Sequence, residues 1–242
     1  MPVDSASGSC GWMINRRVYN DADAVAHALA ESLLGLFDQA IAEPGRQIGV
    51  MLAGGRTPKA AYGLVAASGR HIPPNLTLII SDERWVPADH PDSNALMMQP
   101  FFQAVQAAPE QLLLVNTTLP RLDSAADFGR RLQQFFSSDG SLETAFLGLG
   151  ADGHTASLFS PNDLDRASRQ PAIDVDRPDG RIGISAAPSI IRMATRIVFV
   201  VTGSDKTEKV RSLLAQPRNV IAGQVVWKHP QVAVWLDRAA AE

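Results

Sequence analysis

A histidine and an aspartate in a glycine-rich segment form the stretch of this sequence best suited to chemistry. Asp152 and His154 lie two positions apart, with Gly153 between them and Gly150 before them, and histidine is the side chain that exchanges protons most readily near neutral pH. The apolar residues 145–149 predict a short buried strand, and glycine permits the tight turn that must follow. We expect a short helix from His154 onward. The pattern predicts a proton-transfer site at the carboxyl end of a strand.

Two other interpretations of this stretch stay open at this point. Gly148, Gly150 and Gly153 have the spacing of a dinucleotide-binding fingerprint, which also needs a full crossover helix and a second strand ending in an acidic residue. Pro161 and Pro171 leave no room for that helix. The second alternative is a structural histidine with its hydrogen bonds satisfied inside the fold. Other loops that converge on the same place would favour a functional site.

A second loop has the features of an anion-binding site. The apolar run 47–53 predicts a strand, and Gly54-Gly55-Arg56-Thr57-Pro58 follows it. Thr57 is a good N-cap and Pro58 suits the first helical position, so a helix is expected here. Helix N-termini bind anions, and Arg56 adds a full charge. An ordinary strand-to-helix turn favours the same residues. Because the Gly-Lys-Ser/Thr ending of an ATP-binding loop is missing, a sugar phosphate is expected rather than ATP.

Charged residues also follow two other predicted strands. Asp82, Glu83 and Arg84 come after the apolar run 76–80, and Lys206 follows the run 197–201. A solvated strand end would equally explain the first group, because buried charges are costly unless paired. In a parallel sheet, however, the loops after the strands open on one edge. A base, carboxylates and cations would then surround an anion site, which suits hydrolysis, isomerisation or proton transfer on a small sugar phosphate.

The elements that must position these residues alternate between strands and helices. Strands are predicted at 12–18, 47–53, 76–80, 112–115, 145–149, 181–185, 197–201 and 232–236. Helices are predicted after Asp21, from Thr57, over 94–105, from Asp123 or Ser124, and around 210–214. This alternation predicts an α/β fold with a mostly parallel sheet and helices on both faces. Residues 161–180 predict a long loop, a candidate flap. Residues 1–11 are expected to be loose, 237–242 to form a tail, and 1–242 to be a single domain.

Composition argues against several classes of function. The net charge of −3 gives no reason to expect nucleic acid or a membrane surface as a partner. The single cysteine, Cys10, excludes an internal disulfide and fits a reducing compartment. We find no Cys/His cluster with zinc-ligand spacing, no apolar run approaching about 20 residues and no secretory signal. These observations predict a soluble, cytoplasmic protein without a bound metal.

Five segments of the sequence resemble 6-phosphogluconolactonases. They run in order over nearly the whole chain, at residues 54–58, 81–94, 147–159, 201–206 and 235–240. The second and third, Ser-Asp-Glu-Arg-Trp-Val-Pro-Ala-Asp-His-Pro-Asp-Ser-Asn and Leu-Gly-Leu-Gly-Ala-Asp-Gly-His-Thr-Ala-Ser-Leu-Phe, are long and specific. The resemblance implies a Rossmann-like three-layer sandwich. It also implies hydrolysis of 6-phosphogluconolactone in the pentose phosphate pathway, without metal or cofactor, by a monomer or small homo-oligomer.

The resemblance also implies roles for individual residues. His154 matches the general base, Asp152 its partner in the motif, Arg84 the arginine of the Asp-Glu-Arg motif and Lys206 a phosphate-binding lysine. Residues 54–57 and Arg181 are expected to hold the phosphate as well. The remaining expected substrate-binding residues are Asp82, Glu83, Gly150 and Gly153. Either Arg84 or the backbone N–H groups of residues 150–153 would stabilise the oxyanion.

The sequence departs from the family's pattern in two places. The glycine loop often has serine where Ala53 and Arg56 stand here, so two hydroxyl groups are lost and a cation is gained. The Phe-Pro-Gly that follows the histidine motif in the family is here Phe159-Ser160-Pro161-Asn162. The first departure affects how the phosphate is held, and the second affects the shape of the turn.

Two rival functions belong to different classes. A glucosamine-6-phosphate deaminase would carry Asn-Glu-Pro after the histidine motif, with a glutamate serving the histidine, whereas residues 157–161 here contain no glutamate. A sugar-phosphate sensor domain of a transcription regulator would need a DNA-binding helix-turn-helix, and the segment before Asp21 is too short for one. Both are therefore disfavoured against the lactonase.

Overall fold

The computed structural model describes residues 12–242, so the expected loose segment 1–11 lies outside the described residues. The strands are β1 (Asn15–Tyr19), β2 (Ile48–Leu52), β3 (Leu76–Ile80), β4 (Asp82–Arg84), β5 (Leu112–Leu113), β6 (Ser141–Leu147), β7 (Ala172–Asp176), β8 (Ile182–Ala186), β9 (Arg196–Val201) and β10 (Val232–Asp237). The helices are α1 (Ala22–Ala42), α2 (Arg56–Ala67), α3 (Asn94–Ala104), α4 (Arg121–Ser137), α5 (Pro161–Ala167), α6 (Pro188–Ile191), α7 (Thr207–Ala215), α8 (Ile221–Val225) and α9 (Arg238–Ala241). Short 3₁₀ turns lie at Pro109–Gln111, Ser204–Lys206 and Pro217–Asn219.

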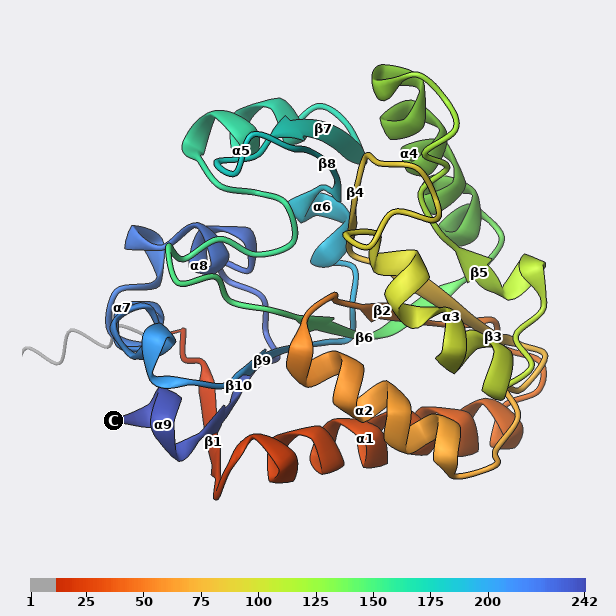
Figure 1. The fold of residues 1–242 in the computed structure, drawn as a ribbon, viewed down its shortest axis with the longest axis horizontal. Coiled ribbons are helices and arrows are strands. Elements are labelled where there is room, and N and C mark those ends of the chain that lie inside the picture. Colours follow the sequence, from red (N-terminus) through yellow and green to blue (C-terminus); the bar gives the residue numbers. More distant parts are fainter. Residues whose placement is uncertain (1–11) are drawn as a thin grey trace, which may run out of the picture.

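A large parallel sheet forms the centre of the molecule. Within residues 12–242 its order is β1-β10-β9-β6-β2-β3-β5, and every neighbouring pair is parallel. All residues of β2 and β3 are buried, as expected of strands covered on both faces. Helices α1 and α2 lie on one face and α4 on the other (Figure 1). The predicted α/β class, with a mostly parallel sheet between helices, is confirmed.

The first helix shows how the sequence places a layer on the sheet. The Asp21 side chain accepts a hydrogen bond of 2.8 Å from the Ala24 N–H, which starts α1 as predicted. Leu29, Leu33 and Phe37 recur at helical spacing and are fully buried. Burying each such side chain contributes roughly 1.5–3 kcal/mol. This apolar stripe holds α1 against the sheet.

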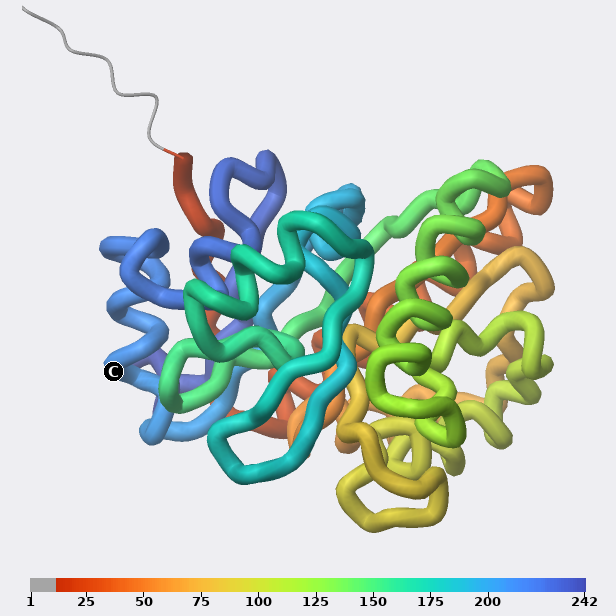
Figure 2. The backbone as a smooth tube through the Cα atoms, turned by 90° about the horizontal axis from the view of Figure 1, so that it is seen from above, coloured from red at the N-terminus to blue at the C-terminus, as the bar shows by residue number. Residues whose placement is uncertain are grey.

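A small antiparallel sheet, β4-β8-β7, lies beside the large one and corrects two predictions. Residues 82–84, expected in a loop, form β4. The segment 161–180, expected to be one long loop, contains α5 and β7, and β7 runs alongside α4 (Figure 2). Ser160 caps α5 by accepting from the Asp163 N–H, and Pro161 occupies the first helical position. The proline interpreted as part of a loop thus begins a helix.

Several predicted element boundaries were also wrong. No helix starts at His154, because the His154 carbonyl accepts from the Gly150 N–H at 2.8 Å and closes a turn. Helix α2 is capped by Gly55 at φ 116°, which places Thr57 in the first turn instead of at the cap. The predicted tail contains α9, whose N-cap Asp237 accepts from the Ala240 N–H. Helix α4 begins earlier than predicted, at Arg121, and β5 is shorter.

Candidate active site

His154 lies in a tight turn after β6 and is held there by Asp152. Its ring Nδ1 is 2.5 Å from Asp152 Oδ1, and its backbone N–H donates to the same oxygen at 3.1 Å. Because a carboxylate only accepts, Nδ1 is the donor and Nε2 keeps a free lone pair. The hydrogen bond to Asp152 therefore fixes the orientation of the imidazole ring.

Gly150 is required for this arrangement. A methyl group at this position would lie 2.1 Å from His154 Nδ1 and 2.5 Å from Asp152 Oδ1. Such distances are impossible for real side chains, so any larger residue would displace the imidazole or the carboxylate. The N–H groups of Gly150 and Gly153 donate to the carbonyls of His154 and Gly150. These two N–H groups, which we expected near an oxyanion, are already used inside the turn.

The charge state of Asp152 follows from its contacts with His154. Partial burial acts to raise the pKa of this carboxyl group, but the backbone and ring nitrogens of His154 outweigh it, and the pKa of Asp152 is lowered from its ordinary value. The Asp152 side chain is therefore a carboxylate at neutral pH and accepts both hydrogen bonds from His154.

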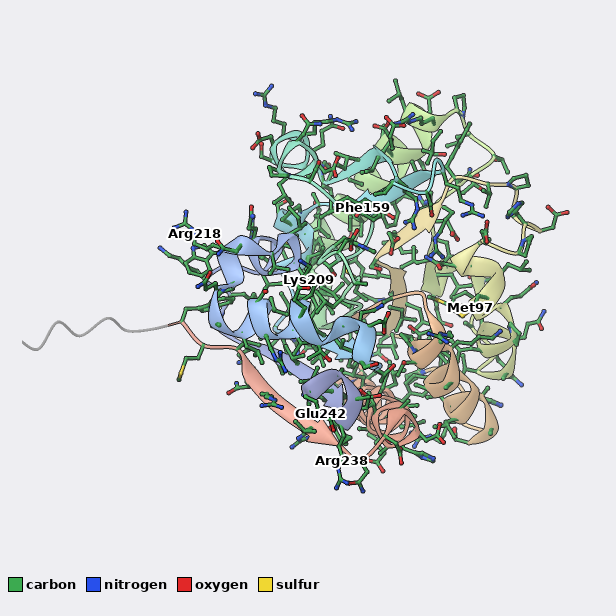
Figure 3. All side chains as sticks on the ribbon, turned by 60° about the vertical axis from the view of Figure 1, so that its left-hand side comes forward. Met97, Phe159, Lys209, Arg218, Arg238 and Glu242 are labelled. Atoms are coloured by element: carbon green, nitrogen blue, oxygen red, sulfur yellow. The ribbon has the colours of Figure 1, made fainter. Side chains whose placement is uncertain are left out.

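Arg177 joins the site from the β7–β8 hairpin and was missed by the sequence analysis. Its guanidinium lies 5.1 Å from the centre of the Phe159 ring, and the His154 ring lies 4.3 Å from the same ring. Phe159, labelled in Figure 3, therefore contacts both the imidazole and the guanidinium. Arg177 also donates to the Ser157 hydroxyl at 3.0 Å. It was missed because its segment was interpreted as loop.

Asp82 is tied beneath the site by hydroxyl groups. Its carboxylate accepts from Ser81 at 2.8 Å and from Ser157 at 2.7 Å, and it is only 6 % exposed. Ser157 also receives the hydrogen bond from Arg177, so the hydroxyl links the carboxylate to the guanidinium. A methyl group at Gly183 would lie 2.7 Å from this hydroxyl oxygen. Through Ser157, Asp82 of β4 thus attaches the segment that contains His154 to the small sheet.

Arg84 lies at the end of β4 and is oriented by Asn94. The guanidinium donates to the Asn94 side-chain oxygen and, at 3.3 Å, to the Asp92 carbonyl. The Asn94 amide in turn donates to the Asp82 carbonyl at 2.9 Å. Gly54 approaches Asn94 so closely that a methyl group there would lie 2.1 Å from its oxygen. Asn94 therefore joins the glycine loop to the arginine.

Glu83 has a structural position and does not face the site. It is buried and accepts from the backbone N–H groups of Arg84, Asn94 and Ala95 and from the Ser93 hydroxyl. Burial raises the pKa of Glu83, although these N–H groups act in the opposite direction. Its carboxylate stabilises the N-terminus of α3. The expected contact of Glu83 with substrate has no support in this geometry.

One end of the site combines the N-terminus of α2 with the cation Lys206, an arrangement suited to an anion. Gly55 caps α2 without a side chain that could accept its first N–H groups, which leaves them available to an anion. The Thr57 and Thr202 hydroxyls are 2.6 Å apart beside them. Lys206, in the 3₁₀ turn after β9, pairs with the exposed Asp205, and this pairing lowers the pKa of Asp205.

A cavity of about 250 Å³, here called the central pocket, brings most of the predicted residues together. Its lining includes Gly54, Gly55, Arg56, Thr57, Asp82, Arg84, Gly150, His154 and Lys206, and also the unpredicted Asn94, Arg177 and Thr202. Four predicted residues do not line it. Asp152 lies behind the imidazole, Glu83 supports α3, Gly153 faces Val220 and Arg181 lines a neighbouring cavity.

Within residues 12–242 no group of three or more His, Cys, Asp or Glu side chains could hold a metal ion. Over the same range no helix is both long and apolar enough to cross a membrane.

Comparison with known proteins places the chain in a family. Residues 20–235 match the family described as glucosamine-6-phosphate isomerases/6-phosphogluconolactonase. A 6-phosphogluconolactonase from Nostoc sp. is 34 % identical over 236 residues, covering 93 % of this chain and 95 % of the relative. A crystal structure described as devB protein aligns with a TM-score of 0.83 and 27 % identity, over 95 % of this chain and 98 % of that one. A monomeric glucosamine-6-phosphate deaminase shares the fold, with a TM-score of 0.72 and 19 % identity over 94 % and 99 % of the two chains. The chain belongs to the glucosamine-6-phosphate isomerase/6-phosphogluconolactonase family.

Proposed function

We propose that this protein hydrolyses 6-phospho-D-glucono-1,5-lactone to 6-phosphogluconate, with His154 as the general base. The observation that carries the proposal is the Asp152–His154 pair, which leaves Nε2 free at a pocket lined by Arg84, Arg177 and Lys206. Membership of the family and the similarity to the Nostoc enzyme support the substrate.

The proposed reaction begins with a water molecule beside His154. Nε2 accepts a proton from the water as its oxygen attacks the lactone carbonyl, and the electron pair of the C=O bond moves onto oxygen. When the tetrahedral intermediate collapses, the bond from C1 to the ring oxygen breaks and the imidazolium returns its proton to that oxygen. General acid–base help of this kind typically contributes 10²–10⁴-fold. Asp152 stabilises the imidazolium between the two transfers.

The arginines are the groups best placed to stabilise the oxyanion. The N–H groups of Gly150 and Gly153 are engaged inside the turn, whereas Arg84 and Arg177 are cationic donors on the lining of the central pocket. Arg84 is held by Asn94 and Arg177 by Ser157, so both are oriented before substrate arrives. Oriented donors of this kind cost little reorganisation during the reaction.

The phosphate of the substrate is assigned to Lys206, the Thr57 hydroxyl and the first N–H groups of α2. A charge-assisted contact to phosphate is among the stronger polar interactions. By fixing one end of the substrate it also orients the lactone carbonyl toward His154. Unphosphorylated gluconolactone is then expected to be a poor substrate.

A deaminase is the alternative that the family and the shared fold leave open, and the lining of the central pocket disfavours it. Among the described residues that line this pocket there is no glutamate to serve the histidine. The test is to incubate the purified protein separately with 6-phosphogluconolactone and with glucosamine 6-phosphate, and to measure lactone loss and ammonia release. Accelerated lactone loss supports the proposal. Ammonia release without any effect on the lactone would replace it with the deaminase.

A further inference from the structure

A second cavity adjoins the central pocket on the side of α2 and α3. It also has a volume of about 250 Å³ and is lined by the first turns of α2, by residues 91–94 and by the tip of the β7–β8 hairpin. We call it the outer pocket. Met97, labelled in Figure 3, lies on its α3 side. Arg56 and Arg84 line both pockets, whereas Lys59 and Arg181 line only the outer one.

The charges around the outer pocket do not balance. Its carboxylates, Asp92 and Asp179, both pair with Arg181, at 2.6 Å and 3.5 Å. Over residues 12–242, no carboxylate forms an ion pair with Arg56, Lys59 or Arg84. The outer pocket therefore has four cations and two carboxylates, and both carboxylates already form ion pairs with Arg181.

The positions of Arg56 and Lys59 concentrate this excess charge. They are three residues apart in the first turns of α2, so they lie on the same side of the helix. The positive end of the helix dipole adds to their field. Both side chains belong to exposed residues, so a ligand reaches them from solvent.

We propose that the outer pocket binds a second phosphate dianion, distinct from the phosphate of the substrate, and that this anion inhibits the enzyme. Inhibition follows because an anion there would use Arg84, which the proposed reaction needs for the oxyanion, and would repel a phosphate bound near Lys206. The ligand chemistry is that of inorganic phosphate or of the phosphate group of a phosphomonoester. The inhibition depends on the proposed lactonase activity, but the binding does not.

The binding test uses inorganic phosphate and a hexose 6-phosphate in calorimetric titrations of the full chain without substrate. Wild type should bind two equivalents of inorganic phosphate. Lys59→Glu should weaken one site by at least about tenfold, because a charge-assisted contact is replaced by a repulsion. Lys206→Ala should weaken the other. Equal binding of the two ligands would indicate recognition of the phosphate alone, and tighter binding of the sugar would indicate a phosphomonoester; both support the proposal.

Control variants distinguish loss of this site from a general change in net charge or a loss of folding. Arg130→Glu changes the charge by the same amount on α4, which lines neither pocket, and should leave both affinities unchanged. Lys59→Gln tests the loss of the cation without adding a carboxylate, and thermal melts check that each variant is folded.

Two results would overturn the proposal. One is a single phosphate site that Lys206→Ala removes and Lys59→Glu leaves intact. The other is a Lys59→Glu enzyme whose KM for the lactone rises as much as that of Lys206→Ala, because the outer pocket would then hold the substrate itself. If phosphate binds twice but no lactone is hydrolysed, only the proposed function fails.

Discussion

Replacing Asp152 by asparagine isolates what the carboxylate does for His154. The Asp152 oxygen accepts from both Nδ1 and the backbone N–H of His154, and the carbonyl oxygen of asparagine can accept from the same two groups. The shape of the turn should therefore survive while the negative charge is lost. The substitution tests electrostatic support of the imidazolium, separately from orientation of the ring.

The expected size of the effect follows from the exposure of the pair. Hydrogen bonds to charged groups contribute about 1.5–3 kcal/mol, against about 1 kcal/mol for neutral ones. The Asp152 side chain is 53 % exposed, so solvent screens part of this difference. A net loss of about 1–1.5 kcal/mol predicts a kcat roughly tenfold lower. His154→Gln removes the base itself and should cost about 10²–10⁴-fold with little change in KM.

The measurement is the initial rate of lactone loss across pH, with the spontaneous hydrolysis subtracted at each point. Because the base must be neutral, kcat/KM should fall on the acid side as the imidazole gains a proton. His27→Gln, on the exposed side of α1, is the matched control and should behave as wild type.

Two results would refute this reasoning. Near wild-type kcat in His154→Gln would show that another group is the base and that the histidine is structural. A loss in Asp152→Asn as large as that in His154→Gln would show that the carboxylate does more than stabilise a charge on the ring.

Further predictions concern the glycine turn, the phosphate and α3. Gly150→Ala should lower kcat at least about 100-fold by displacing the pair, whereas Gly35→Ala on the exposed side of α1, whose methyl meets nothing within 4 Å, should keep kcat near wild type in the same assay. Lys206→Ala should raise KM for the phosphorylated lactone at least about tenfold, with no change in kcat/KM for unphosphorylated gluconolactone. Glu83→Gln should lower the free energy of unfolding by about 1–3 kcal/mol in denaturant titrations. The two carboxylate oxygens accept from the N–H groups of Asn94 and Ala95, so the NH₂ group of a glutamine would face one of these N–H groups and leave it without an acceptor. Burial raises the pKa of Glu83, so as pH rises the unfolded chain loses this proton before the folded chain does. The contribution of Glu83 to the free energy of unfolding therefore declines between the ordinary glutamate pKa and the raised one. This decline should be absent in Glu83→Gln. Treatment with EDTA should leave the rate of lactone loss unchanged.

The parts of the site that the sequence predicts well are those in strand-to-helix loops of the parallel sheet. Parallel strands all end at the same edge of the sheet, so the loops that follow them, with Gly54, Gly150 and Lys206, are placed together by the order of strands and helices. Arg177 could not be predicted in the same way, because it reaches the pocket from an antiparallel hairpin that depends on long-range pairing with β4.

A local signal for this region was nevertheless present in the sequence. Ser160-Pro161 with Asp163 is a helix start, and Ala-Ile-Asp-Val-Asp at 172–176 alternates as a strand does. The abundance of proline and charge in 161–180 outweighed these signals.

The division of the pocket between two sheets has a consequence for how this enzyme can change over evolution. The Asp152–His154 pair and Lys206 follow strands of the large sheet, whereas Arg84 and Arg177 come from the small one. The two sheets have separate hydrogen-bond ladders, so hairpin residues that do not contact Ser157 can be exchanged without disturbing the segment that carries His154. We expect substrate preference to diverge through the small sheet, while the chemistry of proton transfer is inherited with the large one.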